Sequence, residues 1–222
     1  MRHPEPVDSI GRSLTAHAWL AESLRLGEFA TSSPEGAALA VQQGVTEDDI
    51  RTEHIYRVRL LAEKLTRLLP HFAQHVSDES LMDVAERFMT SSAFATQHVA
   101  EAGFQSFLDR FGRFARAEFS DPALADWAVI DSLTYRLPVS EPLSAGYVLC
   151  SALMACAGDP FGLGTPGYWV ALSLNEAGRL TAHPLNAAVV QAVEALRSST
   201  EIMDAATCSQ LLELGVIRHG AH

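Results

Sequence analysis

His71 and His75 are the two side chains whose spacing most directly suggests chemistry. They are four residues apart, and on a helix this spacing places two imidazoles on one face, where they can share a metal ion. The residues between them, Phe72-Ala73-Gln74, do not supply the acid of a zinc-protease motif. Because two ligands alone do not define a metal site, we interpret the pair as solvated or helix-capping histidines.

The three cysteines of the chain, Cys150, Cys156 and Cys208, do not indicate a disulfide framework or a metal site. Their number is odd, and their spacing does not match paired zinc ligands. Free thiols in a reducing cytoplasm explain them most simply. Cys150 and Cys156 lie in an apolar segment, so we interpret both as small buried hydrophobic residues with no catalytic role.

Two aspartates, Asp126 and Asp131, interrupt the otherwise apolar segment 124–131. They are either buried charge partners or contacts to another chain, but solvent-facing positions fit equally well, because residues five apart do not share one narrow helical stripe. The chain has no nucleophile elbow, phosphate-binding loop, dinucleotide fingerprint or convincing pair of acids. The sequence therefore predicts no catalytic residue, metal site or cofactor in this chain, and a self-contained small-molecule enzyme is the weakest option.

The overall charge also restricts the function. The 222 residues include 27 acidic and 16 basic side chains, for a formal net charge of −11. A nucleic-acid backbone or an anionic membrane is a poor partner for such a chain. The first residues lack the apolar core of a signal peptide, and no apolar stretch is long enough to span a bilayer, so we expect a cytoplasmic protein.

The elements that position these residues are predicted to be helical from the N-terminus to about residue 137, which forms a first domain, residues 1–137. Thr46 and Asp49 resemble a capping box and predict a long helix that ends near Pro70. Ser77 predicts another N-cap, and Ser120-Asp121-Pro122 begins a helix that continues to Leu133. Further helices are expected over 12–26 and 96–119, the second with Phe104, Phe107, Phe111 and Phe114 as an aromatic core stripe.

The C-terminal part is predicted to be a small α+β module. A connecting segment, residues 138–166, leads to a module of residues 167–222. Its expected elements are a strand over Tyr168–Leu174, a turn over Asn175–Gly178, a strand over Arg179–His183, a helix opened by Pro184, a helix over Met203–Leu214 and a strand over Val216–Arg218. This order is typical of a winged-helix-like domain, so the fold class is mainly α with a small α+β C-terminal module.

The charge of this module decides between two readings of its shape. Between Tyr168 and Gly220 it carries three arginines and five acidic residues: Arg179, Arg197, Arg218, Glu176, Glu194, Glu201, Asp204 and Glu213. An acidic module is poorly suited to neutralise phosphates, although a winged-helix-like transcriptional regulator stays an alternative function. The hairpin also offers a sheet edge, which can capture an extended peptide through backbone hydrogen bonds.

Several segments of the chain together resemble a bacterial family that is labelled as DNA-binding. They are Tyr56–Leu61, Leu68–Phe72, Leu81–Phe88, Ala102–Leu108 and Leu124–Ala128, and the resemblance covers most of the range from Ile50 to Ile217. Members of this family have a helical N-terminal region and a small α/β module. They often accompany an iron-dependent TIM-barrel enzyme that modifies ribosomally made peptides. The chain is most similar to the branch formed by the accessory subunits of methanobactin biosynthesis.

This resemblance implies a noncatalytic subunit of a heterodimer. The expected partner is a TIM-barrel iron oxygenase, which holds the iron, whereas this chain carries no cofactor of its own. The accessory subunit binds the leader of a precursor peptide whose cysteines become oxazolone and thioamide groups, and the product is a copper-chelating peptide. The helical domain would dock on the enzyme, and no nucleic acid or membrane is expected as a partner.

The sequence and the resemblance agree on the hairpin as the place where a leader peptide can bind. Such a peptide can add as an antiparallel strand, with its register set by side chains of the hairpin. The candidate peptide-binding residues are Trp169, Ala171, Ser173, Arg179, Thr181 and His183. Each of them can instead complete the core of the domain, and the sequence does not say which strand is the free edge.

Overall fold

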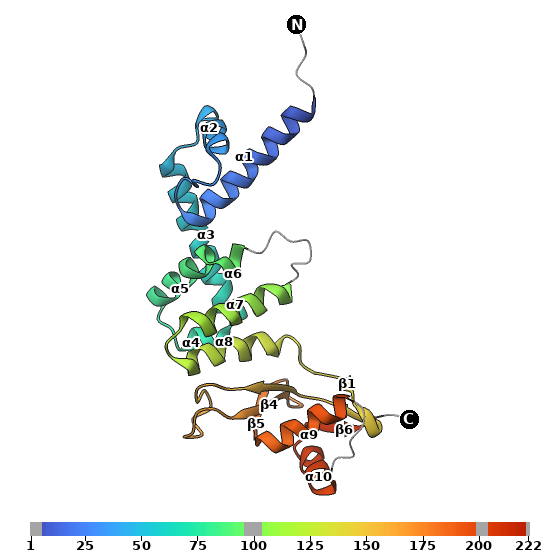
Figure 1. Ribbon diagram of the computed structural model, residues 1–222. Coiled ribbons are helices and arrows are strands. Elements are labelled where there is room, and N and C mark those ends of the chain that lie inside the picture. Colours follow the sequence, from blue (N-terminus) through green and yellow to red (C-terminus); the bar gives the residue numbers. More distant parts are fainter. Residues whose placement is uncertain (1–5, 96–103, 199–203, 221–222) are drawn as a thin grey trace. The chain divides into compact units, whose positions relative to one another are not determined.

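A computed structural model describes residues 6–95, 104–198 and 204–220 (Figure 1). The chain forms two compact units: the first contains Met1–Arg67 and Val76–Val99, and the second contains Leu68–His75 and Ala100–His222. The described part is mainly helical and carries two small antiparallel sheets of three strands each. The predicted fold class, mainly α with a small β-containing part, is confirmed at this level.

The helices of the described part are α1 Pro6–Leu26, α2 Pro34–Gln42, α3 Glu47–Leu68, α4 Pro70–Gln74, α5 Asp78–Thr90, α6 Ser92–Ala95, α7 Phe104–Glu118, α8 Pro122–Thr134, α9 Ala187–Ser198 and α10 Ala205–Glu213. The helices α3, α5 and α8 begin close to the predicted signals, whereas α1 begins at Pro6, six residues before the predicted start, and the short helices α2, α4 and α6 were not predicted. The helix predicted over 96–119 is described only from Phe104 onward, because residues 96–103 lie outside the described part. Met203, the predicted start of the last helix, also lies outside it.

Local capping chemistry explains why the helices begin where they do. Thr46 Oγ1 accepts a hydrogen bond from Asp49 N at 3.1 Å, and Asp49 Oδ2 accepts one from Thr46 N at 2.9 Å, so the predicted capping box is confirmed. The hydrogen bond from the Thr46 side chain lowers the pKa of Asp49. Ser77 and Asp121 cap α5 and α8 as predicted.

In the first unit, the core is built on one face of α3 and on the end of α1. Ile50, Val58 and Leu65 of α3 are buried. Trp19 of α1 is buried as well and donates from Nε1 to the carbonyl oxygen of Ala30 at 2.8 Å. The buried imidazole of His54 lies 3.0 Å from the carbonyl oxygen of Leu24, which ties α3 to α1.

In the second unit, the predicted aromatic stripe of α7 is core. Phe107, Phe111 and Phe114 are buried, and the ring of Phe111 contacts that of Phe72 with centroids 5.3 Å apart. The Phe104 side chain lies outside the described residues. The rings of Phe111 and Phe114 also contact each other, with centroids 5.8 Å apart, so the stripe has a packing role, as expected of aromatic residues at helical spacing.

The segment predicted as a connection, residues 138–166, contains three strands that complete both sheets. The strands of the chain are β1 Glu141–Pro142, β2 Tyr147–Leu149, β3 Ala152–Ala155, β4 Trp169–Leu174, β5 Leu180–Leu185 and β6 Ile217–His219. One sheet has the order β1-β2-β6 and the other the order β3-β4-β5, all antiparallel. A 3₁₀ turn over Ser144–Gly146 joins β1 to β2.

The sheet β3-β4-β5 has a hydrophobic layer on each face. Val170 and Leu172 of β4 pack with Ile130 of α8, whereas Ala171 packs with Val193 of α9 and residues of α10 and β6. Successive residues of a strand point to opposite faces, so β4 contributes to both cores. Figure 1 shows α8 on one side of this sheet and α9 with α10 on the other.

One prediction about the tail is wrong in detail. Pro184 does not open a helix, because β5 runs through it to Leu185 and α9 begins at Ala187, where Asn186 Oδ1 accepts from Val189 N at 2.8 Å. Main-chain pairing with β4 extends β5 through Pro184 to Leu185, so the strand and not the helix-start signal of proline prevails there. The last strand, β6, pairs with β2, which lies far away in the sequence.

Candidate functional site

The turn between β4 and β5 fixes the register of the hairpin. Gly178 N donates to the carbonyl oxygen of Asn175 at 2.8 Å, Asn175 N donates to that of Arg179 at 2.9 Å, and Gly178 has a φ of +71°. The Asn175 side chain also accepts from Arg179 N at 2.9 Å. This is a three-residue hairpin loop with a glycine in the left-handed region. It places Ser173 opposite Thr181 and Ala171 opposite His183.

The structure identifies β5 as the hairpin strand at the sheet edge, since β4 lies between β3 and β5. Hydrogen-bonded and non-hydrogen-bonded pairs alternate along an antiparallel ladder, and Asn175 with Arg179 is a hydrogen-bonded pair. The backbone groups of Leu180, Ala182 and Pro184 therefore face away from β4. Proline has no N–H, so the free edge offers donors only at Leu180 and Ala182.

The opposite edge of the sheet, β3, is partly occupied by a side chain. Arg116 of α7 donates from Nη2 to the carbonyl oxygen of Ala155 at 3.3 Å. By the same alternation, Leu153 and Ala155 direct their backbone groups outward. Because one of these outward carbonyl groups already accepts a bond from the protein itself, β5 is the more available of the two edges.

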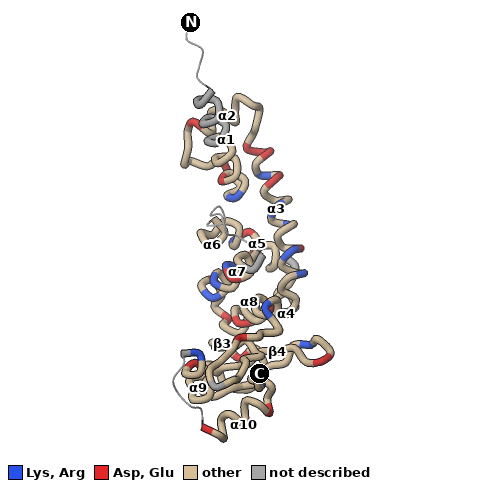
Figure 2. The backbone as a smooth tube through the Cα atoms, turned by 90° about the vertical axis from the view of Figure 1, so that its right-hand side faces the viewer, with Lys and Arg blue, Asp and Glu red and all other residues tan. Residues whose placement is uncertain are grey.

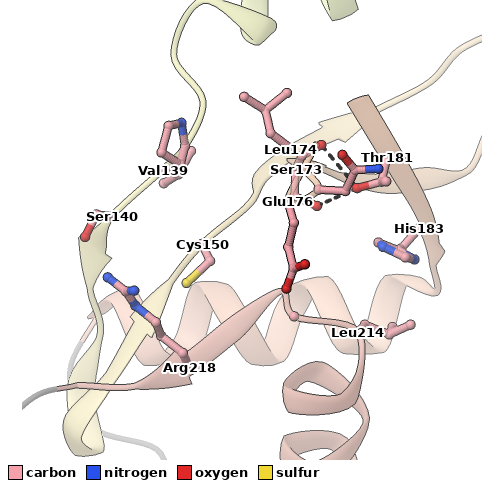
Figure 3. A pocket seen from close by; sticks show the side chains of 13 residues that line it. Val139, Ser140, Cys150, Ser173, Leu174, Glu176, Thr181, His183, Leu214 and Arg218 are labelled. Atoms are coloured by element: carbon pink, nitrogen blue, oxygen red, sulfur yellow. Dashed lines mark hydrogen bonds between the residues drawn. The ribbon is translucent and has the colours of Figure 1, made fainter. Parts of the chain in front are cut away.

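A groove of about 490 Å³ lies beside β5 (Figure 3). Its walls come from the hairpin, from the segment before β1, from the end of β2 and from the segment that contains β6. The residues that line it are Pro138, Val139, Ser140, Cys150, Ser173, Leu174, Asn175, Glu176, Thr181, His183, Leu214, Gly215 and Arg218. The groove is thus assembled from segments far apart in the sequence.

Three of the six candidate peptide-binding residues line this groove: Ser173, Thr181 and His183. The other three do not. Trp169 is half-buried against the core that includes α9, and Ala171 is fully buried in it. Arg179 is exposed at the hairpin turn, away from the lining. Strand alternation does not separate the two groups, because Trp169 and Ala171 lie on the same face of the hairpin as Ser173. Trp169 and Ala171 are instead covered by the hydrophobic core that includes Val193 of α9.

Sequence reasoning missed the residues of the other walls, above all Glu176, Cys150 and Arg218. Glu176 was identifiable as a turn residue next to a candidate wall. Cys150 and Arg218 line the groove because β2 pairs with β6, and no local sequence pattern predicts that pairing. The prediction that Cys150 is buried is wrong, because it is half-buried and lines the groove, whereas Cys156 is buried as predicted.

Some polar groups of the groove are hydrogen-bonded within the protein, whereas others have no ion-pair partner among the described residues. Ser173 Oγ and Thr181 Oγ1 lie 2.8 Å apart and share a hydrogen bond. Glu176 and Arg218 are both exposed, and within the described part of the chain neither has an oppositely charged side chain within 4.0 Å. Figure 2 shows an acidic and a basic position at the tip of the hairpin, and this basic position belongs to the turn, whereas Arg218 lies on β6. The groove therefore combines neutral, paired hydroxyls with charges that can pair with a ligand.

A second polar cluster surrounds Asp131 of α8, which is fully buried. Its carboxylate accepts from Phe72 N at 2.8 Å and lies 2.6 Å from His71 Nδ1, so it caps the start of α4 from another helix. Burial raises the pKa of Asp131. The rings of His71 and His75 stack on Trp127 at centroid distances of 5.3 and 5.5 Å. His71 is thus a hydrogen-bonded, stacked residue and not simply a solvated one.

Asp126, one turn earlier on α8, holds the loop that follows β3. It is fully buried, accepts from Gly158 N at 2.8 Å and lies 3.9 Å from Arg116 Nη2. Burial raises the pKa of Asp126, and burial together with the nearby Asp126 charge raises the pKa of Cys156 to about 12. Of the alternatives open from the sequence, both aspartates are buried partners, and their contacts are structural.

Neither a cluster of metal ligands nor a membrane-spanning helix occurs in the described part of the chain. Within residues 6–95, 104–198 and 204–220, no three His, Cys, Asp or Glu side chains gather as a set of metal ligands. No helix in the same ranges has the length and hydrophobicity needed to cross a bilayer. Comparison with protein-family models and with curated proteins finds no match to the chain.

Proposed function

We propose that this chain is the noncatalytic, peptide-binding subunit of a heterodimeric iron-dependent oxygenase. The observation that carries the proposal is the free edge of β5 beside a groove lined by Ser173, Thr181 and His183. An extended peptide can add to such an edge as a further strand, with its main chain paired to β5. Its alternate side chains then lie on the face of the sheet that borders the groove.

The ligand that we propose is the leader of a ribosomally made precursor peptide. Main-chain pairing supplies affinity without demanding a particular sequence, and groove contacts supply the selection. The partner would be a TIM-barrel enzyme that holds the iron and converts cysteines of the precursor to oxazolone and thioamide groups, as in the biosynthesis of the copper chelator methanobactin. The helical N-terminal region would dock on that enzyme.

The order of β4, β5, α9, α10 and β6 also supports a winged-helix-like description of the C-terminal module. A transcriptional regulator is the competing function for such a module. The three arginines and five acidic residues from Tyr168 to Gly220 favour peptide over DNA, because duplex binding depends on neutralising phosphates. Tight, sequence-specific duplex binding with a steep dependence on salt would favour the regulator instead.

A binding experiment with an altered edge tests the proposal. Ala182→Pro removes the outward donor of Ala182 and leaves the hydrogen-bonding groups that face β4 in place. The probe is a synthetic leader of a cysteine-containing precursor encoded near a TIM-barrel oxygenase and this chain. Fluorescence anisotropy should show binding to the wild-type chain and a loss of affinity of about tenfold for Ala182→Pro. A folded Ala182→Pro chain that binds the leader normally would contradict the proposal.

A second arm leaves the protein unchanged and alters the peptide, so that folding is not in question. N-methyl groups are placed on every other residue of the leader, in one register or in the alternate one. Strand addition predicts that only one of the two sets abolishes binding, because successive amide groups of a strand point to opposite sides. Co-expression with the oxygenase should then give a stable heterodimer that oxidises the precursor, and loss of leader binding should abolish turnover.

A further inference from the structure

Two unpaired charges of opposite sign line the groove from different walls. Glu176 extends from the hairpin turn, and Arg218 extends from β6 (Figure 3). Both side chains are exposed and, among the described residues, neither forms an ion pair. Arg197, which is also exposed, instead pairs with Glu141 at 2.9 Å. Glu176 and Arg218 are therefore not committed to holding the fold together.

We infer that the groove selects an extended peptide that carries one acidic and one basic side chain, with the acid at Arg218 and the base at Glu176. This inference rests on the proposed function, because it assumes that a peptide strand occupies the β5 edge. Arginine can bind a carboxylate with two parallel hydrogen bonds, whereas a carboxylate accepts from lysine or arginine. The ligand class is thus an amphoteric extended segment rather than a uniformly acidic or basic one.

The rest of the lining is compatible with such side chains. Val139, Leu174 and Leu214 supply apolar surface on which the methylene stems of long charged residues can pack. The hydroxyl groups of Ser173 and Thr181 already bond to each other, so they do not compete for the charged ends of the ligand. Charge selection in the groove therefore depends on Glu176 and Arg218.

The two charges also give the bound strand a direction. The outward N–H donors of β5 are restricted to Leu180 and Ala182, so only a short stretch of main chain can pair with a peptide. Main-chain pairing of this kind does not distinguish one peptide sequence from another. A peptide that runs the wrong way would place its base near Arg218 and its acid near Glu176. Like charges at both positions disfavour that orientation.

The inference is tested by selecting peptides from a displayed random octapeptide library on the full chain. Wild-type protein should enrich peptides that contain one acidic and one basic residue at a fixed separation. Arg218→Gln should abolish the acidic preference alone, and Glu176→Gln the basic preference alone. The double reversal, Arg218→Glu with Glu176→Arg, should enrich the opposite order of charges. Enrichment without any charge preference would overturn the inference.

Matched control variants test whether the charge preference is specific to the residues that line the groove. Arg179→Gln and Glu213→Gln remove exposed charges that do not line the groove, and both should leave the selection unchanged. For an enriched peptide, each groove substitution should weaken binding by about two- to fivefold at low salt, since exposed ion pairs contribute modestly. Equal effects from Arg179→Gln would contradict a role specific to Arg218.

The outcomes separate this inference from the function on which it rests. If Ala182→Pro abolishes binding of the enriched peptides but Arg218→Gln leaves their charge preference unchanged, edge binding is supported and charge selection is overturned. Failure of the wild-type chain to enrich or bind any peptide would overturn the proposed function, and the charge selection with it.

Discussion

Two sets of charged residues in the second unit, the aspartates of α8 and the ionic residues of the groove, differ in burial and in pairing. Asp126 and Asp131 are fully buried and accept hydrogen bonds from backbone N–H groups. Glu176 and Arg218 are exposed and have no ion-pair partner among the described residues. Burying a carboxylate is costly unless it is hydrogen-bonded, and Asp126 is only partly satisfied because its Oδ1 atom has no hydrogen-bond partner. An exposed charge can instead remain available for a ligand. The first set therefore maintains architecture, and the second set is suited to recognition.

The largest expected effect comes from removing the buried carboxylate of Asp131. Asp131→Ala deprives Phe72 N and His71 of their acceptor, and we expect a loss of about 3 kcal/mol in the free energy of unfolding. Asp131→Asn, which keeps one acceptor oxygen, should cost less. Urea denaturation of both variants measures the difference. If Asp131→Ala unfolds at the same urea concentration as wild type, the carboxylate does not hold α4 to α8.

A smaller loss should follow when the loop held by Asp126 is forced away from α8. A Cβ atom at Gly158 would lie 2.6 Å from Ala123 Cα and closer still to its backbone nitrogen. Gly158→Ala should therefore destabilise the chain by about 2 kcal/mol through steric overlap with backbone. Gly162→Ala in the same loop, where φ is +67° but no atom is near, should cost about 1 kcal/mol. Thermal unfolding of the two variants should rank them in this order.

The dependence of stability on pH distinguishes the buried aspartates from ordinary surface carboxylates. Burial raises the pKa of Asp126 above its ordinary value of 3.8, so the folded state retains a proton that the unfolded state has lost. The contribution of this group to stability therefore falls as pH rises from 3.8 through the folded pKa. Relative to wild type, Asp126→Asn should gain stability as pH increases across this window. Parallel stability curves for the two proteins would contradict the expectation.

The smallest effect should come from the hydroxyl pair in the groove. Ser173→Ala removes the 2.8 Å hydrogen bond to Thr181, which is half-buried and neutral, and should lower the free energy of unfolding by about 1 kcal/mol or less. Because these hydroxyls are already paired, the same change should leave the charge preference of bound peptides intact. A shift in that preference, measured by the library selection, would assign Ser173 a direct role in recognition.

Much of the helical part could be predicted because its signals are local. Thr46 with Asp49, Ser77 and Asp121 each mark a helix start within four residues of sequence. The face of α3 that carries Ile50 and Leu65 follows from helical periodicity.

The strands between residues 138 and 166 could not be predicted, for a physical reason. They contain two to four residues each, which is too few for an alternating pattern. Their pairing depends on β4 and β6, which lie up to 70 or so residues further along the chain.

Only part of the candidate site could be predicted from the sequence, because the rest depends on pairing between distant segments. Ser173, Thr181 and His183 belong to one hairpin and follow from its alternation. Arg218 reaches the groove through the pairing of β2 with β6, and Cys150 through its position at the end of β2. Ala171 and Trp169 share the face of Ser173 but lie further from the hairpin tip, where α9 covers that face.

Pro184 also affects how the exposed edge of β5 can associate with other copies of the chain. A long unpaired strand is a template for uncontrolled association between copies, and proline at the outward-facing position of an edge strand interrupts that template. In β5 the proline leaves only the stretch around Leu180 and Ala182 with free donors. Pro184 therefore shortens the edge that we propose for peptide docking, and it also interrupts a template for edge-to-edge aggregation.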